Sequence, residues 1–157
     1  MNGLYVVAKA LHVFGAVVFI GNIITAALWK LRADATRNPR VVLETVRTVH
    51  LCDWVFTAPG VALLLGSGLF MAARAGIPIW DVFWLRTAFV LLNVTGVLWV
   101  AVLLPVQSAL IREAARGLEQ GQITHRYRTL SLVWNAVGLV ATLLPLINLY
   151  LMIARPT

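Results

Sequence analysis

Cysteine and charged residues are both scarce in this sequence. Of its 157 residues one is cysteine, Cys52, and 12% are Asp, Glu, Lys or Arg. A single cysteine excludes any disulfide within the chain and any Cys-x-x-Cys redox or zinc motif. Soluble domains are about a quarter charged. The shortage of charge, together with 61% hydrophobic residues, therefore places the chain among membrane proteins.

Four long apolar runs take up most of the chain. They cover about residues 4–29, 48–73, 83–111 and 128–154, and each exceeds the roughly 20 residues that cross the hydrocarbon core. The first run is too long for a signal peptide and no basic segment precedes it, so we expect it to be retained. The sequence predicts one transmembrane domain over residues 1–157. Its expected fold is all-α, an integral membrane antiparallel four-helix bundle in contact with the lipid bilayer.

Basic residues are concentrated in two of the three connections between these runs. Nine of the thirteen lysines and arginines lie there: Lys30, Arg32, Arg37, Arg40 and Arg47 in the first connection, and Arg112, Arg116, Arg126 and Arg128 in the last. The positive-inside rule places both connections in the cytoplasm and both termini outside. The net charge of +7 is then explained without a nucleic-acid partner.

Prolines and small residues interrupt the apolar runs. Pro59, Pro105 and Pro145 each remove a backbone hydrogen bond, which we expect the hydroxyl groups of Thr57 and Thr142 to replace in part. The second run also carries a narrow face of small residues: Gly60, Gly66, Ser67 and Gly68. Such a face suits close packing of another helix, and a flat ligand is the alternative.

Three cationic or titratable side chains fall in the outer third of the predicted bundle: Lys9, His12 and Arg86. At ~1.5 Å per residue His12 lies roughly 12 Å below the outer end, too deep to reach water. Ionisable groups inside a membrane indicate a functional site by default. A neutral imidazole ligates iron or copper, so His12 is a candidate metal ligand. Gly15 beside it leaves room for a flat ring, and Lys9 and Arg86 suit the two propionates of haem b. The alternative is a neutral histidine that hydrogen-bonds to another helix.

Other polar residues in the spans suggest further contacts. Candidates for a second axial ligand are Asn93, Asn148, Met71 and Met152, although asparagines in membranes, Asn22 and Asn135 included, more often join helices by hydrogen bonds. His50, Asp53 and His125 lie toward the inner surface, roughly 20 Å from His12. We expect them to form a polar cap in reach of water, with Asp53 paired to Arg47 or Arg128. A metal site is the alternative.

The whole chain resembles a bacterial family of predicted four-span integral membrane proteins of unknown function. The resemblance rests on "LHVFGAVVFIGN" (residues 11–22), "DWVFTAPGVALLLGSGL" (residues 53–69) and "YRTL" (residues 127–130) with the tryptophan that follows. It implies a multi-pass protein of the bacterial inner (cytoplasmic) membrane, and the positive-inside rule makes it N-out and C-out.

Parts of this pattern are similar to two further families. Membrane protoporphyrinogen oxidases of the HemJ type share a K-A-L-H-x-x-G opening and a T-x-P-G, which here comprises Thr57, Pro59 and Gly60. The resemblance implies that His12 binds haem b. The HemJ-type W-L-H-x-K stretch is matched here by Trp84 and Leu85, but Arg86 replaces its histidine and Ala88 its lysine. That change argues against protoporphyrinogen oxidation. CopD-type membrane proteins, linked to copper handling, open with a similar L-H segment.

The leading hypothesis is a haem b-binding membrane protein for redox chemistry or electron transfer, with His12 as ligand and Lys9, Gly15 and Arg86 around it. The alternatives are a cofactor-free accessory subunit of a membrane complex, and copper handling. Expected partners are a second copy or a larger membrane complex, and a quinone or a tetrapyrrole. No nucleophile–base pair, phosphate-binding loop or carboxylate dyad argues for hydrolysis, and whether the protein is an enzyme stays open.

Overall fold

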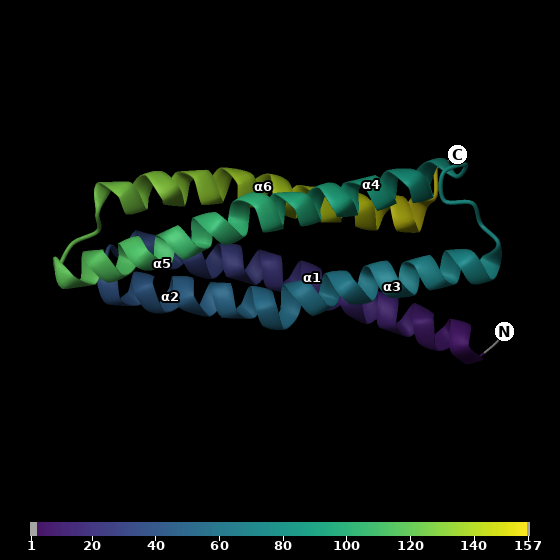
Figure 1. The fold of residues 1–157 in the computed structure, drawn as a ribbon, viewed down its shortest axis with the longest axis horizontal. Helices are drawn as coiled ribbons and strands as arrows, with labels where there is room; N and C mark the ends of the chain where they lie inside the picture. Colours follow the sequence, from purple (N-terminus) through teal and green to yellow (C-terminus); the bar gives the residue numbers. More distant parts are fainter. Residues whose placement is uncertain (1–2, 157) are drawn as a thin grey trace.

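The computed structural model describes residues 3–156, and nearly all of them are helical. The elements are α1 (Gly3–Thr36), α2 (Pro39–Cys52), the π-helix η1 (Asp53–Thr57), α3 (Ala58–Ala75), α4 (Phe83–Leu98), the π-helix η2 (Trp99–Leu103), α5 (Leu104–Glu119) and α6 (His125–Ala154). Helices α2 and α3 continue each other through η1, and α4 and α5 through η2, so four long rods lie side by side (Figure 1). All four rods are long and apolar enough to cross a membrane, which confirms the predicted all-α membrane bundle.

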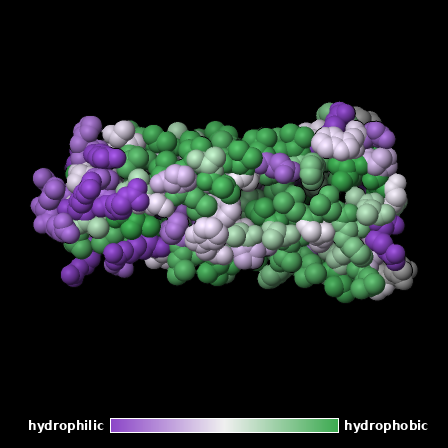
Figure 2. Space-filling model, viewed as in Figure 1, coloured by the Kyte–Doolittle hydropathy of each residue, from purple (hydrophilic) through white to green (hydrophobic). Residues whose placement is uncertain are grey.

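The two ends of the bundle differ in polarity. One end holds both termini and the α3–α4 connection, and we call it the termini end (Figure 1). The other holds the α1–α2 and α5–α6 connections, and we call it the basic end. Hydrophilic residues gather at the basic end, whereas the surface along the rods is mainly hydrophobic (Figure 2). This banding is what a bilayer requires of a protein that spans it.

At the basic end the helices extend well beyond the apolar runs. Helix α1 continues to Thr36 and α5 to Glu119. Lys30 and Arg32 were expected in a connecting loop, and they are helical instead. The reason is that these extensions are rich in alanine, leucine and arginine, which favour helix without being apolar enough to count as membrane span. Here α2 buries Val42, Leu43, Val46 and Val49 in a core shared with α5 and α6.

Toward the termini end the helices pack in two pairs, α1 with α3 and α4 with α6. The backbones of the first pair lie very close together: a β-carbon at Gly15 would lie 3.0 Å from the carbonyl oxygen of Gly60, and one at Gly60 would lie 3.0 Å from Cβ of Phe19. Small residues permit such contact between backbones in a membrane. The small-residue face of α3 is therefore occupied by a helix over this stretch, although Gly66 faces open space.

Both π-helices end just before a proline. The amide of Ala58 donates to the carbonyl of Asp53, and that of Leu104 to the carbonyl of Trp99, five residues back in each case. Pro59 and Pro105 have no N–H for an α-helical ladder, and a widened turn accommodates this loss. Contrary to expectation, the hydroxyl groups of Thr57 and Thr142 do not replace the backbone hydrogen bonds that the prolines remove. Thr57 bonds to the Asp53 carboxylate and Thr142 to the carbonyl of Gly138.

Candidate functional site

His12 lies on α1 and points at α3. Its Nδ1 is 3.0 Å from the carbonyl oxygen of Leu64 and 3.1 Å from Oγ of Ser67. The Ser67 hydroxyl donates its own proton to the carbonyl of Leu63, so toward His12 it accepts, as the Leu64 carbonyl must. Both partners of Nδ1 are therefore acceptors. The ring carries its proton on Nδ1, and the neutral form keeps a lone pair on Nε2.

The room beside His12 does not lie where we expected it. Gly15 is buried, and its α-carbon faces the Gly60 carbonyl and Leu63 of α3. A flat ring has no space there, because the two backbones have closed on each other. Gly68 is the glycine nearest the imidazole, since a β-carbon at that position would lie 3.2 Å from Cε1 of His12.

Lys9 and Arg86 do not come together. Lys9 is exposed on α1, one turn before His12, and borders a shallow apolar hollow with Val6, Ala10, Val13, Phe14 and Val17. Arg86 is exposed on α4, where its guanidinium donates to the carbonyl of Trp80 at 3.4 Å. Because α1 packs against α3 and α4 against α6, Arg86 lies on the other helix pair from Lys9 and His12.

Both asparagines proposed as second ligands lie on the α4–α6 pair, whereas His12 lies on the α1–α3 pair. Asn93 is exposed and bonds to the carbonyl of Phe89 in its own helix, at 2.8 Å. Asn148 of α6 donates to the carbonyl of Ala88 in α4 at 3.1 Å, so it joins two helices as asparagines in membranes commonly do. Met71 on α3 and Met152 on α6 are half-buried.

Asp53 is the centre of a buried polar cluster that draws on four elements. Its Oδ1 accepts hydrogen bonds from Asn22 at 3.2 Å and Thr57 at 3.0 Å. Its Oδ2 accepts from Gln107 at 2.6 Å and from the indole of Trp99 at 3.4 Å. Only 6% of Asp53 is exposed, and none of the ion pairs within residues 3–156 includes it.

This burial corrects the expected polar cap. Asp53 pairs with neither predicted arginine, and Arg47 bonds instead to Glu44 at 3.4 Å. His50 bonds through Nδ1 to Oε1 of Gln107 at 3.0 Å, while His125 is exposed at the start of α6. No group of three or more His, Cys, Asp or Glu side chains that could hold a metal occurs among the described residues. The alternative of a metal site at these three residues therefore has no ligand cluster.

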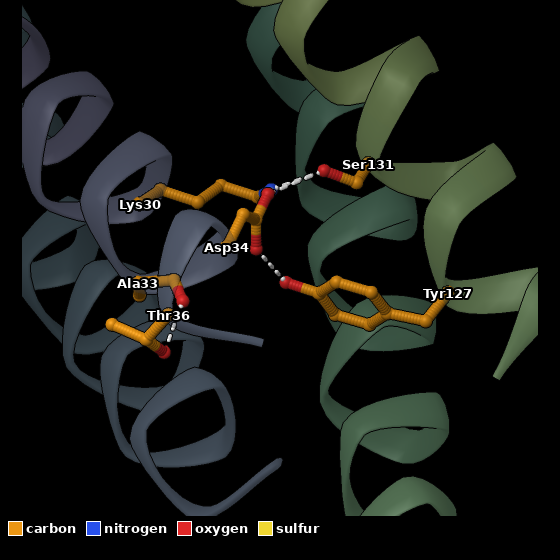
Figure 3. Close-up of polar contacts among 6 residues, drawn as sticks. All are labelled: Lys30, Ala33, Asp34, Thr36, Tyr127 and Ser131. Carbon is orange, nitrogen blue, oxygen red and sulfur yellow. Dashed lines mark hydrogen bonds and ion pairs between the residues drawn. The ribbon is translucent and has the colours of Figure 1, made fainter. Parts of the chain in front are cut away.

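A second buried cluster, at the basic end, escaped the sequence analysis (Figure 3). Lys30 is 1% exposed and donates to Asp34 and to Ser131, both at 2.7 Å. Tyr127 and Ser131 of α6 each donate to the Asp34 carboxylate at 2.6 Å, so the cluster ties α1 to α6. The available signal was the i, i+4 spacing of Lys30 and Asp34, matched by that of Tyr127 and Ser131.

Comparison with known proteins identifies a family and no nearer relative. No curated protein and no solved structure matches the chain. The sequence profile of one family, described as predicted integral membrane protein (DUF2269), matches residues 6–156. That match covers all four membrane-spanning rods and both buried polar clusters. The chain belongs to this family of predicted integral membrane proteins.

Proposed function

We propose that this membrane protein binds haem b through Nε2 of His12 and serves in membrane redox chemistry or electron transfer. The observation that carries the proposal is the pair of acceptors on Nδ1, the carbonyl of Leu64 and Oγ of Ser67. Histidine ligands of metals commonly donate their other ring N–H to a carbonyl, which fixes the tautomer and raises the basicity of the ligating nitrogen. His12 has this arrangement of its Nδ1.

The other expected site residues fit haem b unequally. Lys9, one turn from His12 and exposed, is placed to neutralise a propionate near the membrane surface. Gly15 supports the site only indirectly, by allowing α3 to come close enough for its Leu64 carbonyl to bond His12. Arg86 lies on the other helix pair and is left out of a site formed by one chain. A bound haem b would supply reversible one-electron chemistry at iron.

The membrane and orientation belong to the same proposal. The basic end carries most of the lysine and arginine residues, and the positive-inside rule then places it in the cytoplasm of a bacterium, with both termini outside. His12 would lie toward the outer face of the inner membrane. Cysteines introduced in the α3–α4 connection and in the α5–α6 connection, tested with a membrane-impermeant thiol reagent on intact cells, decide between the two orientations.

A visible absorption spectrum tests haem binding. The protein is purified in detergent from cells well supplied with haem, and spectra are recorded before and after dithionite. We expect a Soret band with sharpened α and β bands on reduction, lost in His12→Ala and kept in the matched control His125→Ala, since His125 is exposed at the opposite end. Ser67→Ala keeps the ligand and one acceptor, so we expect it to retain haem with a shifted midpoint potential.

Two outcomes would contradict the proposal. A colourless wild-type protein that also fails to take up added haem would favour a cofactor-free accessory subunit, in which His12 only ties α1 to α3. A Soret band that survives in His12→Ala would move the ligand elsewhere. Copper handling is less well supported, because the described residues place no group of His, Cys, Asp or Glu ligands with His12.

A further inference from the structure

Asp53 differs from the other acidic side chains that are withdrawn from solvent. Asp34 is paired with Lys30 at 2.7 Å, and Glu113 with Arg116 at 2.6 Å. Asp53 is buried within a membrane-spanning rod, and no Lys, Arg or His lies within ion-pair distance among residues 3–156. An unpaired charge inside a membrane costs several kcal/mol, and such residues mark ion and proton pathways.

The neighbours of Asp53 all present hydrogen atoms to it. Thr57 accepts a hydrogen bond from Asn22 at 2.9 Å, so its own hydroxyl proton is free to point at Asp53. Together with the amide groups of Asn22 and Gln107 and the indole of Trp99, four donors surround the two carboxylate oxygens. This shell stabilises the anion without neutralising it. A proton on this carboxylate would find no acceptor among these groups unless one of them turns.

Gln107 couples this carboxylate to His50. Its Nε2 donates to Oδ2 of Asp53 while its Oε1 accepts from Nδ1 of His50. When a proton binds to Oδ2, the new O–H needs an acceptor, and rotation of the Gln107 amide by half a turn supplies Oε1. The same rotation turns Nε2 toward His50, whose Nδ1 must then accept, with the ring proton on its Nε2. Protonation of Asp53 and the tautomer of His50 thus change together.

The backbone around Asp53 is also unusual. Both π-helices meet here, since η1 begins at Asp53 and η2 begins at Trp99. Their tryptophan rings, Trp54 and Trp99, lie 5.9 Å apart. Single π-turns occur frequently at functional sites, where they turn a side chain away from the position that a regular helix would give it.

Other charged or titratable groups near Asp53 do not neutralise it. On its own rod Cys52 precedes it and is half-buried. On α1 the nearest cation is Lys30, roughly 12 Å further along the helix from Asn22 and bonded to Asp34. On α5 it is Arg112, exposed and roughly 8 Å along the helix from Gln107. On α2 it is His50, which reaches Asp53 only through Gln107.

We infer that Asp53 is a proton-binding site inside the membrane, which takes one proton from water and returns it while Gln107 and His50 change their hydrogen bonds in step. One O–H bond forms at the carboxylate with a proton from water; on His50 the Nδ1–H bond breaks and an Nε2–H bond forms, through exchange of that proton with water, and no electron moves. The site does not depend on haem, and the proposal stands or falls separately from that of His12.

Infrared spectroscopy of the protein in lipid nanodiscs tests this site. The C=O stretch of a protonated carboxyl group is recorded as the pH is lowered, with ¹³C-aspartate labelling and in an Asp81→Asn background that removes an exposed aspartate. We expect one label-sensitive band that requires Asp53 and disappears in Asp53→Asn. In Asp53→Asn the new amide group faces four hydrogen-bond donors and could disturb the fold. Asp53→Glu, which keeps the carboxylate, is therefore the second variant. In Asp53→Glu we expect the band to persist and to lose its sensitivity to ¹³C-aspartate labelling, because the carboxyl group now belongs to a glutamate.

The link to His50 has its own readout in the same samples. We expect ¹⁵N NMR of the imidazole nitrogens to show the His50 ring, identified by its loss in His50→Gln, changing tautomer over the pH range in which the band grows. In Gln107→Leu we expect the Asp53 carboxyl band to persist, while the His50 ring no longer changes tautomer as that band grows. The proposal is overturned if no Asp53-dependent band appears while the fold persists, or if millimolar sodium abolishes the band, which would make Asp53 a metal-cation site.

Discussion

The ammonium of Lys30 lies 2.7 Å from the carboxylate of Asp34, one turn further along α1, and 5.1 Å from the centre of the Trp134 ring. Ser131 accepts from the lysine and donates to the same carboxylate. A residue that the charge pattern assigns to a loop is thus the polar centre of the contact between α1 and α6 (Figure 3). The buried ammonium is neutralised by the Asp34 carboxylate and also bonds to Ser131. Removal of the lysine or of the carboxylate would leave its partner's charge unpaired and lower stability strongly.

We expect Lys30→Met to lower the free energy of unfolding by about 3–5 kcal/mol, because it leaves the Asp34 carboxylate without its cation. The measurement is reversible unfolding in mixed detergent micelles, followed by circular dichroism. Lys9→Met is the matched control, since Lys9 is exposed, and it should change stability little. The double variant Lys30→Met/Asp34→Leu should recover part of the loss. Equal stability of Lys30→Met and wild type would show that the cluster contributes nothing net.

A second prediction concerns the α1–α3 contact. In Gly15→Ala the new methyl group would lie 3.0 Å from both the Gly60 carbonyl oxygen and Cβ of Leu63, so the helices must separate. We expect a loss of about 1–3 kcal/mol, as in other overpacked cores, and a lower melting temperature. Gly66→Ala is the control, because nothing lies within 4 Å of the added carbon. The prediction is wrong if Gly15→Ala and Gly66→Ala have the same melting temperature.

The third prediction concerns the start of α6. Thr124 accepts a hydrogen bond from the amide of Tyr127 and donates to Glu113 at 3.3 Å. Thr124→Ala removes this N-cap, and we expect unfolding to become easier by about 0.5–2 kcal/mol. Thr129→Ala serves for comparison, since that exposed hydroxyl bonds only to the carbonyl one turn back. An effect at Thr129 equal to that at Thr124 would rule out the cap as the cause.

The sequence alone determined that four helices span the membrane. Transfer of an apolar run into lipid is a property of that run, so length and hydropathy suffice to find it. The same reasoning placed His12 inside the bundle and singled it out as costly there. Helix ends at the basic end were less predictable, because α1 and α5 stay helical for about two turns beyond the apolar runs.

Only the tertiary structure decided what each polar side chain faces. Hydropathy gives the depth of Asp53 along its helix but neither its direction nor its partners, and depth alone suggested an interface. Its donors come from positions 31, 46 and 54 residues away as well as from its own turn. Ser131, which bonds Lys30, is 101 residues away in the chain.

The physical reason is that lipid is as apolar as the side chains that it touches. Burial of apolar surface therefore does not choose which helix faces meet inside a membrane. Hydrogen bonds, ion pairs and the close approach of glycines choose them, and each of these needs two partners from different helices. The apolar runs determined that the chain crosses the membrane, and pairs such as Gly15 with Gly60 and Asp53 with Gln107 decided how the helices assemble.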